Sequence, residues 1–265
     1  GKTILLESIF VLAMTRSHRT SQEQELIGWN QESAYIKGEL QKKHANLPLE
    51  ILLTKKGRKT KVNHIEQKKL SSYIGQMNVI LFAPEDLSLV KGSPQLRRRF
   101  LDMEIGQINP IYLYDLVQYQ KILKQRNHYL KQLAEKKQTD ELYLDILTEQ
   151  LVEFGSKIFI ARKHFVERLQ YWANQLHSQI SQGKEQLQLE YVASIPLVDQ
   201  MDLGAIQQQF TEILAKNREK ERFRQMTTVG PHRDDLFFLI NGKNVQTFGS
   251  QGQQRTAVLT IKFAS

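Results

Sequence analysis

Gly249-Ser250-Gln251-Gly252-Gln253-Gln254-Arg255 is a polar stretch that leads into the mostly apolar residues 257–264. This change predicts a loop followed by a helix. A serine and a glycine at the mouth of a helix can offer a hydroxyl, backbone N–H groups and the positive end of the helix dipole to a phosphate. Ser250, Gly252 and Gln253 are therefore candidate phosphate-binding residues. The alternative is an ordinary serine N-cap beside a glycine turn.

A second candidate phosphate site opens the chain with Gly1-Lys2-Thr3, ahead of residues 3–14, which predict a helix that is apolar nearly all round. The triplet matches the end of a phosphate-binding loop, in which Lys2 supplies charge and Thr3 a magnesium ligand. The triplet thus predicts a bound phosphate group with Mg²⁺. Only the end of the loop pattern is present, so the triplet alone leaves a chance match open.

Long amphipathic helices are predicted in the middle of the chain. From residue 110 onward, leucines recur every seven residues, which is the pattern of a narrow helical seam. Residues 140–180 predict a second helix, about 60 Å long at about 1.5 Å per residue. Its apolar positions, which include Phe165 and Trp172, are expected to form the core and the seam. The two helices should form an antiparallel arm.

Shorter elements flank the arm, and most of them are extended. In chain order, the predicted elements are extended segments at 33–65 with a basic-tipped hairpin, a short helix near 66–74, a buried strand at 78–82, a helix after Ser93-Pro94, a strand at 187–192, a helix at 202–222, and a hairpin of strands 236–240 and 245–248.

Positive charge is concentrated in one region. Between Lys37 and Lys69 there are 10 basic and 3 acidic residues, so this stretch carries 10 − 3 = +7 of the formal +9. A localised positive field attracts the nucleic-acid backbone. A lysine-rich solubilising surface is the alternative. The predicted DNA-binding residues are Lys55, Lys56, Arg58, Lys59 and Lys61.

Composition narrows the classes of protein. No apolar run approaches the roughly 20 residues of a membrane helix, so no membrane partner is predicted. The chain has no cysteine, which fits a cytoplasmic location. Its seven histidines are scattered, so a metal held by protein ligands alone is not expected. Because the chain starts at Gly1 without a leader, we expect its natural start to lie upstream.

A phosphate-loop end and a late serine loop, separated by a helical arm, resemble the layout of the SMC-like branch of ABC-type ATPases, whose signature motif the late loop is similar to. Several further stretches resemble the RecF family, and their agreement in order along the chain is more specific than any single loop. These stretches are Leu5-Leu6-Glu7, Arg16-Ser17-His18-Arg19-Thr20, residues 82–87, 90–94, 97–102 and 123–127, and Gly230-Pro231-His232-Arg233-Asp234-Asp235-Leu236.

The resemblance implies an α/β fold, a P-loop ABC-type ATPase head with an inserted helical arm, or lid. Residues 1–109 would form the first part of the head with the basic hairpin, 110–222 the arm, and 223–265 the second part with the signature motif. It also implies ATP and Mg²⁺ as cofactors, an ATP-dependent homodimer, and DNA repair, recombination and replication within the SOS response to DNA damage. The implied action is at single-stranded and gapped DNA, beside RecO and RecR, to load RecA.

The resemblance further implies that the start of the phosphate loop lies before Gly1 and the Walker B strand after Ser265. No catalytic residue is therefore predicted within these residues. Whether the protein is an enzyme is left open: at most it is a slow, DNA-stimulated ATPase at full length, and this chain alone is not expected to hydrolyse ATP.

Further nucleotide or subunit-interface candidates are Arg16, Arg19, His232 and Arg233. A solvated loop is the alternative for the first two, and a self-satisfied polar corner after the Gly-Pro turn is the alternative for the last two. The leading function is an ATP-controlled DNA clamp. The alternatives are another SMC-like or ABC-type head, whose arm joins a longer coiled coil, and a non-enzymatic basic scaffold that binds DNA whether or not ATP is present.

Overall fold

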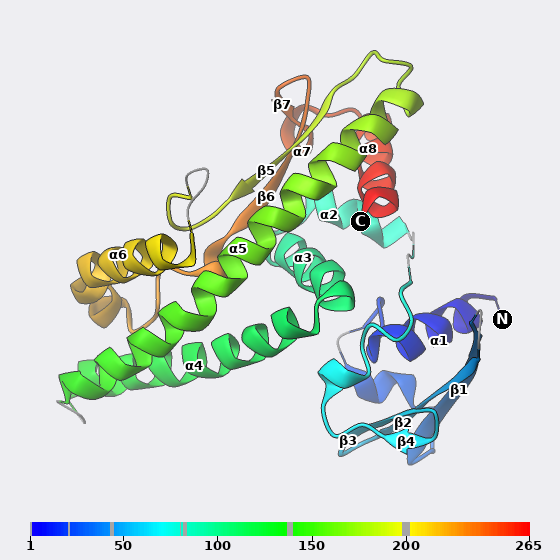
Figure 1. The fold of residues 1–265 in the computed structure, drawn as a ribbon, viewed down its shortest axis with the longest axis horizontal. Coiled ribbons are helices and arrows are strands. Elements are labelled where there is room, and N and C mark those ends of the chain that lie inside the picture. The colour runs from blue at the N-terminus through cyan, green and yellow to red at the C-terminus, as the bar shows by residue number, and fades with distance from the viewer. Residues whose placement is uncertain are drawn as a thin grey trace. The chain divides into compact units, whose positions relative to one another are not determined.

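The computed structural model describes residues 2–20, 22–42, 45–79, 81, 84–136, 140–197 and 202–265. The chain divides into two compact units, which are considered separately (Figure 1). The first unit comprises residues 1–81 and 106–111, and the second comprises residues 82–105 and 112–265.

In the described part of the first unit, an α-helix packs on an antiparallel sheet. The elements of this unit are α1 (Lys2–Met14), η1 (Glu23–Leu26), β1 (Ser33–Gln41), β2 (Asn46–Thr54), β3 (Gly57–Val62), β4 (Ile65–Glu66) and η2 (Leu70–Ser72), and the strands pair in the order β1-β2-β3-β4.

The alternating side chains of β2 build the core of this unit. Leu49, Ile51 and Leu53 are almost fully buried on the face that α1 covers, together with Val11 and Leu12 of α1. The helix lies so close to β1 that a Cβ at Gly38 would stand 2.5 Å from Leu12 Cδ2. A side chain at residue 38 would have to displace the end of the Leu12 side chain, so the helix and the strand pack closely at this crossing.

Helix α1 is buried along only part of its length, whereas its apolar sequence predicts a helix buried throughout. Residues 10–14 are buried, whereas Ile4, Leu5, Leu6 and Ile9 are exposed by 67, 63, 53 and 43%. In this chain only the second half of the helix lies on the sheet, so the first half has no sheet surface to cover it.

The second unit is a helical arm joined to a small three-stranded sheet, in the order β5-β6-β7. Its elements are η3 (Pro84–Leu87), α2 (Ser88–Lys91), α3 (Pro94–Ile108), α4 (Pro110–Ala134), α5 (Glu141–Ile180), β5 (Leu187–Val192), α6 (Leu203–Arg224), η4 (Pro231–Arg233), β6 (Asp235–Ile240), β7 (Lys243–Asn244), α7 (Val245–Phe248) and α8 (Gln251–Ala264); the last residues of α3 and the first two of α4 belong to the first unit.

Helix α5 is the central element of this unit and runs beside α6, α8 and β5 (Figure 1). Helix α4 packs against its first turns through the rings of Tyr129 and Tyr143. A Cβ at Gly155 would stand 2.7 Å from the Phe210 ring and 3.0 Å from the Tyr119 ring. The absent side chain lets α4 and α6 approach α5 closely. Asp140 caps the start of α5 by accepting hydrogen bonds from the N–H groups of Leu142 and Tyr143.

Two predicted elements are wrong, and a third is shorter than predicted. Among the described residues 78, 79 and 81 there is no strand, and the Val79 N–H donates to the side chain of Gln107 at 3.1 Å instead of to a strand partner. Near 66–74 the chain forms only the short η2 turn. Residues 245–248 form the single helical turn α7, which Asn244 caps through the Gln246 N–H.

Candidate nucleotide and DNA sites

The first candidate site lies at the start of α1, which begins at Lys2. Gly1 and the side chains of Lys2 and Thr3 lie outside the described residues, so their contact with phosphate or magnesium stays a prediction. Further along α1, Glu7 accepts a hydrogen bond from Ser17 Oγ at 2.6 Å, and its other carboxylate oxygen lies 3.7 Å from Arg19 Nη1. The loop after α1 thus folds back along the helix.

The predicted basic loop at residues 16–20 is held by its own side chains. Ser17 Oγ accepts hydrogen bonds from the N–H groups of Arg19 and Thr20. His18 packs edge-on against Phe10, with 5.3 Å between the ring centroids. Arg19 is half exposed and Arg16 is half buried. Contact of either arginine with a nucleotide stays a prediction.

The predicted DNA-binding residues are divided between the two faces of the sheet. Lys59 and Lys61 lie on the outer face and are exposed or half buried, and Lys55 and Lys56 form the exposed turn between β2 and β3. Arg58 instead lies opposite the buried Leu53, on the inner face. DNA contact by these residues stays a prediction.

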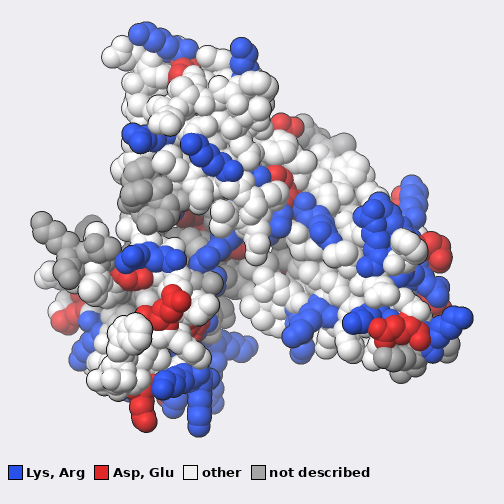
Figure 2. Space-filling model, turned by 180° about the vertical axis from the view of Figure 1, so that it is seen from behind, with Lys and Arg blue, Asp and Glu red and all other residues white. Residues whose placement is uncertain are grey.

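The outer face of this sheet is balanced in charge. Lys37, Glu50, Lys61 and Glu66 are paired in turn across β1, β2, β3 and β4. Glu50 accepts a hydrogen bond from Tyr35 Oη at 2.7 Å, which is the main reason why its pKa is lowered. Figure 2 shows Lys and Arg side chains on this unit among Asp and Glu side chains. Lys55 and Lys56, in the exposed turn between β2 and β3, lie outside this balanced face.

The second candidate site is the start of α8. Ser250 Oγ accepts a hydrogen bond from the Gln253 N–H at 3.2 Å, and Gln253 Oε1 accepts one from the Ser250 N–H at 2.9 Å. This is a capping box, so the serine N-cap considered from the sequence is present. A serine hydroxyl that accepts one hydrogen bond still has a proton to donate. Ser250 and Gly252 are exposed.

The two glycines beside Ser250 differ in what the fold requires of them. A Cβ at Gly249 would stand 2.6 Å from the Val245 carbonyl oxygen, so this glycine is needed for local packing. At Gly252 the nearest atom to an added Cβ would be Ser250 Oγ, at 3.8 Å. This chain alone therefore has room for a side chain at residue 252.

Side-chain contacts connect this helix start to the end of the arm. Gln253 Nε2 donates to Glu185 Oε1 at 2.8 Å, and Glu185 Oε2 lies 3.0 Å from Nε2 of the buried His177 in α5. The other ring nitrogen of His177 lies 3.4 Å from Thr260 Oγ1 in α8. The first turn of α8 is thus tied to the last turn of α5.

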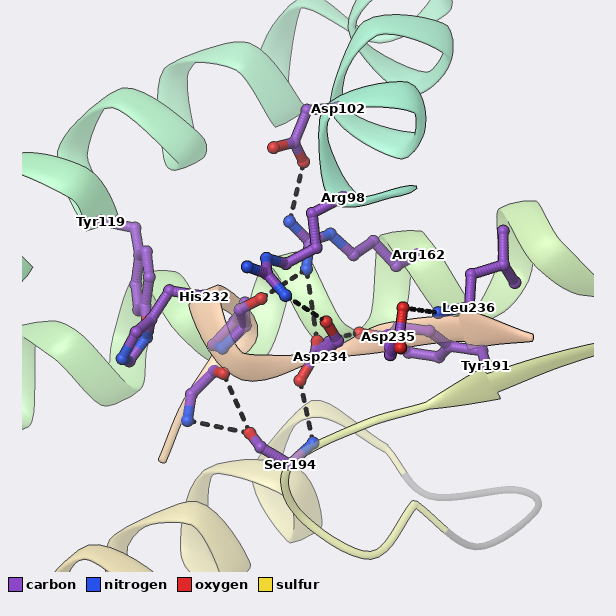
Figure 3. Close-up of polar contacts among 12 residues, drawn as sticks. Arg98, Asp102, Tyr119, Arg162, Tyr191, Ser194, His232, Asp234, Asp235 and Leu236 are labelled. Carbon is purple, nitrogen blue, oxygen red and sulfur yellow. Dashed lines mark hydrogen bonds and ion pairs between the residues drawn. The ribbon is translucent and has the colours of Figure 1, made fainter. Parts of the chain in front are cut away.

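The stretch Gly230-Pro231-His232-Arg233-Asp234-Asp235 forms a buried polar corner at the start of β6 (Figure 3). Asp234 is fully buried, accepts hydrogen bonds from Tyr191 Oη and the Ser194 N–H, and pairs with Arg162 at 3.3 Å. Arg162 also donates to Asp102 and to the Pro231 carbonyl oxygen. The corner thereby joins α3, α5 and β6.

The arginines of α3 contribute to the same corner. Arg97 forms two hydrogen bonds to the carboxylate of Asp235, at 2.6 and 2.9 Å. Arg98 donates to the backbone carbonyl of Asp234 at 2.6 Å. Three consecutive arginines cannot share one helix face, and two of them here hold the start of β6.

His232 is satisfied within this unit. Its Nδ1 lies 2.7 Å from Tyr119 Oη, and its Nε2 lies 3.1 Å from the Thr227 carbonyl oxygen, which fixes Nε2 as the donor. Burial lowers the pKa of His232 to about 4. Arg233 reaches the same carbonyl oxygen at 3.2 Å. A nucleotide or interface role for either residue stays a prediction.

Known proteins similar to this chain share its whole length. No family model matches the chain. It is 67% identical over 266 residues to the DNA replication and repair protein RecF of Enterococcus faecalis, across all of this chain and 71% of that protein. The chain belongs to the RecF family. The protein of the same name from Bacillus subtilis is 54% identical over 264 residues, again across 71% of its length.

Solved RecF structures share the fold. A structure of the recombination mediator protein RecF-ATPrS in the RecFOR pathway matches with a TM-score of 0.93 and 33% identity, over 99% of this chain and 71% of that one. A structure of RecF-ATP matches with a TM-score of 0.92 and 33% identity, over 98% of this chain and 69% of that one. The predicted fold, an α/β ATPase head with a helical arm, is confirmed for this RecF-family chain.

Some residues that shape these candidate sites were not predicted from the sequence. Arg162, Glu185 and His177 make the contacts that connect the arm to β6 and α8. Arg162 lies among the apolar residues of the predicted helix 140–180. A charged residue at such a position is seldom buried without a partner, and this could have marked Arg162 as a residue with a buried partner. For Glu185 there is no such signal, because it lies in a polar turn.

The residues at α8 fit a bound phosphate, with an exposed hydroxyl, a helix N-terminus and open space at Gly252. In the described part of the RecF-family chain there is no group of three or more His, Cys, Asp or Glu side chains placed to hold a metal ion. No described helix is long and apolar enough to cross a membrane.

Proposed function

We propose that this chain is the ATP-binding head and arm of a RecF-type protein that dimerises on ATP and binds DNA. The observation that carries the proposal is the start of α8. Ser250 is exposed there, and packing within this chain does not require a glycine at residue 252, which leaves room for a ligand. ATP would lie between Gly1, Lys2 and Thr3 of one subunit and Ser250, Gly252 and Gln253 of the other.

The chemistry of each group supports this arrangement. The Lys2 ammonium would neutralise phosphate charge, and the Thr3 hydroxyl would be a ligand for the Mg²⁺ that ATP carries. Ser250 and the backbone N–H groups of α8 would donate hydrogen bonds to the triphosphate. Binding energy from two subunits would favour the dimer only while ATP is present. ATP hydrolysis would then allow the dimer to separate.

The remaining predicted roles belong to the same proposal. Residues 1–109 and 223–265 would form the head and 110–222 the arm. Arg16, Arg19, His232 and Arg233 would lie near the nucleotide or the opposing subunit. The tip residues Lys55 and Lys56, with Lys59 and Lys61, would lie toward DNA. Arg58, which the sequence also suggested for DNA contact, lies on the inner face of the sheet. The protein would act at gapped DNA beside RecO and RecR, to help load RecA, in the cytoplasm. The names of similar proteins, which place RecF in replication, repair and the RecFOR pathway, support this assignment.

A charge substitution at the N-cap separates the proposed phosphate contact from the stability of α8. Asn and Asp cap helices as well as Ser does, so Ser250→Asn and Ser250→Asp should both fold. The aspartate would place a negative charge against the triphosphate. We expect S250D to lose ATP-dependent dimerisation in sedimentation velocity, while S250N retains at least part of it. A dimer equally strong in S250D and the wild type would contradict a phosphate at this position.

A further inference from the structure

Arg58 differs from the other basic residues of the β2–β3 hairpin. Its neighbour Lys59 lies on the outer face of the sheet, whereas Arg58 is paired with Leu53 on the inner face. The Arg58 side chain is 26% exposed. Because alternate residues of a strand lie on opposite faces, Arg58 is directed toward the end of α1 and not toward the surface that Lys59 and Lys61 form.

The guanidinium of Arg58 joins three separate segments. Nη1 donates to the carbonyl oxygen of Thr15, directly after α1, and lies 3.2 Å from Thr15 Oγ1. Nη2 pairs with Glu23 Oε1 in η1 at 2.8 Å. One side chain therefore links the hairpin, the end of α1 and the following turn.

Thr15 holds a backbone conformation that its side chain disfavours. Its φ is 59°, in the left-handed region, and the residue is fully buried. A β-branched residue in this region is strained, and such strain persists only where the surroundings impose it. Here the surroundings are Arg58 and Tyr73, whose hydroxyl donates to the Leu12 carbonyl oxygen at 2.7 Å. If these contacts opened, Thr15 would be free to relax to an ordinary backbone conformation.

Helix α1 connects this strained end to the proposed phosphate loop. The helix begins at Lys2 and ends at Met14, next to Thr15. A helix is stiff along its axis, so a shift imposed at Lys2 by a triphosphate would reach Thr15. The hairpin tip, Lys55 and Lys56, precedes Arg58 by only a few residues.

We propose that Arg58 is a positioning residue that couples ATP binding at the start of α1 to DNA binding at the hairpin tip. This proposal rests on the proposed function. With ATP bound, Arg58 holds Thr15 in its left-handed conformation and the tip in its DNA-binding position. Without ATP, the contacts open more often. By linkage, DNA must strengthen ATP binding by the same factor that ATP strengthens DNA binding.

Two substitutions disrupt the contacts without removing positive charge from the hairpin. Glu23→Gln removes the partner of Nη2, and Arg58→Lys keeps one charge but cannot reach Thr15 and Glu23 together. The quantity to measure is the ratio of the DNA Kd without ATP to the DNA Kd with a non-hydrolysable ATP analogue, by fluorescence anisotropy in the intact protein. We expect a wild-type ratio of about 5 to 150, which falls toward about 1 in both variants.

Lys59→Gln is the matched control. It removes an exposed charge of the same hairpin but none of the Arg58 contacts, because the partner of Lys59 is Glu66 at 3.9 Å. K59Q should weaken DNA binding with and without nucleotide alike and keep the wild-type ratio. If Arg58 acted only through its charge, Glu23→Gln should strengthen DNA binding with and without nucleotide, because it makes the region more positive. It should then leave the ratio of the two Kd values unchanged.

Each outcome bears on one proposal or on both. A wild-type DNA affinity that does not respond to the ATP analogue would overturn the proposed function and the coupling together. A wild-type response that both E23Q and R58K retain would overturn the coupling alone. A ratio that falls in K59Q as far as in E23Q would show that it follows charge, and would also overturn the coupling. Thermal unfolding of each variant confirms that the proteins compared are folded.

Discussion

Single buried polar residues hold the second unit together. The guanidinium of Arg162, fully surrounded by protein, contacts Asp102 of α3, Asp234 before β6 and the Pro231 carbonyl oxygen. Burial of an unpaired charge is very costly, so these partners must form together for the arginine to be tolerated inside. Burial raises the pKa of Asp234, and the nearby Arg162 charge opposes the rise. The corner is therefore a strong constraint on how α5 meets β6.

His232 makes the stability of this corner depend on pH. Burial lowers its pKa from 6.5 to about 4, and the nearby Arg233 charge adds to the effect. Between these values the unfolded chain binds more protons than the folded one, so the free energy of unfolding falls as the pH falls. From pH 7.5 to pH 5, we expect His232 to contribute a loss of about 2 kcal/mol, from about 1.36 kcal/mol per pKa unit.

His232→Gln provides the comparison, because glutamine has both a donor and an acceptor but does not titrate in this range. Urea unfolding of both proteins at the two pH values isolates the contribution of His232, since the other titrating groups are shared. The variant should lose less stability on acidification than the wild type does. Equal losses would show that His232 does not titrate as its burial requires.

Cap and turn residues could be predicted from the sequence, whereas the tertiary contacts of single side chains could not. Ser250 and the Gly230-Pro231 turn could be singled out because helix caps and turns use a short list of residue types. The position of Arg58 on the inner face follows from the alternation of Leu49, Ile51 and Leu53 through the hairpin, but its contacts with Thr15 and Glu23 do not. They depend on how the loop after α1 folds back, which no local pattern specifies.

At the scale of elements, the long helices were the most predictable. The apolar pattern of residues 140–180 corresponds closely to α5, and most of its predicted seam is buried. Trp172 is the exception and is 54% exposed, because the buried positions pass from Leu169 to Ala173 and His177. A helix has 3.6 residues per turn, so a seam that advances by exact heptads drifts out of phase.

Short elements were predicted less well for a physical reason. A run of four or five apolar residues fits a strand and a helical turn equally, and tertiary contacts decide between them. Residues 245–248 form a helical turn that Asn244 caps, and the Val79 N–H donates to the side chain of Gln107, which lies far along the chain.

The hairpin is the element that should set the salt dependence of DNA binding. The outer face of its sheet is balanced in charge, whereas Lys55 and Lys56 are exposed at the tip outside that face, so we expect them to contact phosphates. Each phosphate contact that is lost should make the plot of log K against log salt shallower by about 0.9 for duplex DNA. The double variant K55Q/K56Q should therefore lower the slope by about 1 to 2, with little dependence on sequence.

The control for this measurement is K216Q/K220Q, which removes two exposed lysines of α6 and so changes the net charge equally. Its slope should stay near that of the wild type. An equal change of slope in both double variants would mean that overall charge, and not the hairpin tip, governs DNA binding.

For the whole molecule, the central claim is that Lys2 and Ser250 act on the same triphosphate from opposite subunits. Two observations on one chain support this claim. The start of α8 is exposed, and there is room beside Gly252 for a ligand. A symmetric dimer of this kind has two composite sites, each built from both subunits. Two single variants, defective in opposite halves of the site, should therefore complement each other.

The most direct test mixes Lys2→Ala protein with Ser250→Asp protein, labelled with different fluorophores, and follows ATP-dependent association by sedimentation. Each variant alone should remain monomeric. In the mixture, Lys2 of one subunit meets Ser250 of the other, which restores one intact site, so we predict ATP-dependent heterodimers that carry both labels. If the mixture stays as monomeric as its components, the two residues do not share a nucleotide across the subunit boundary.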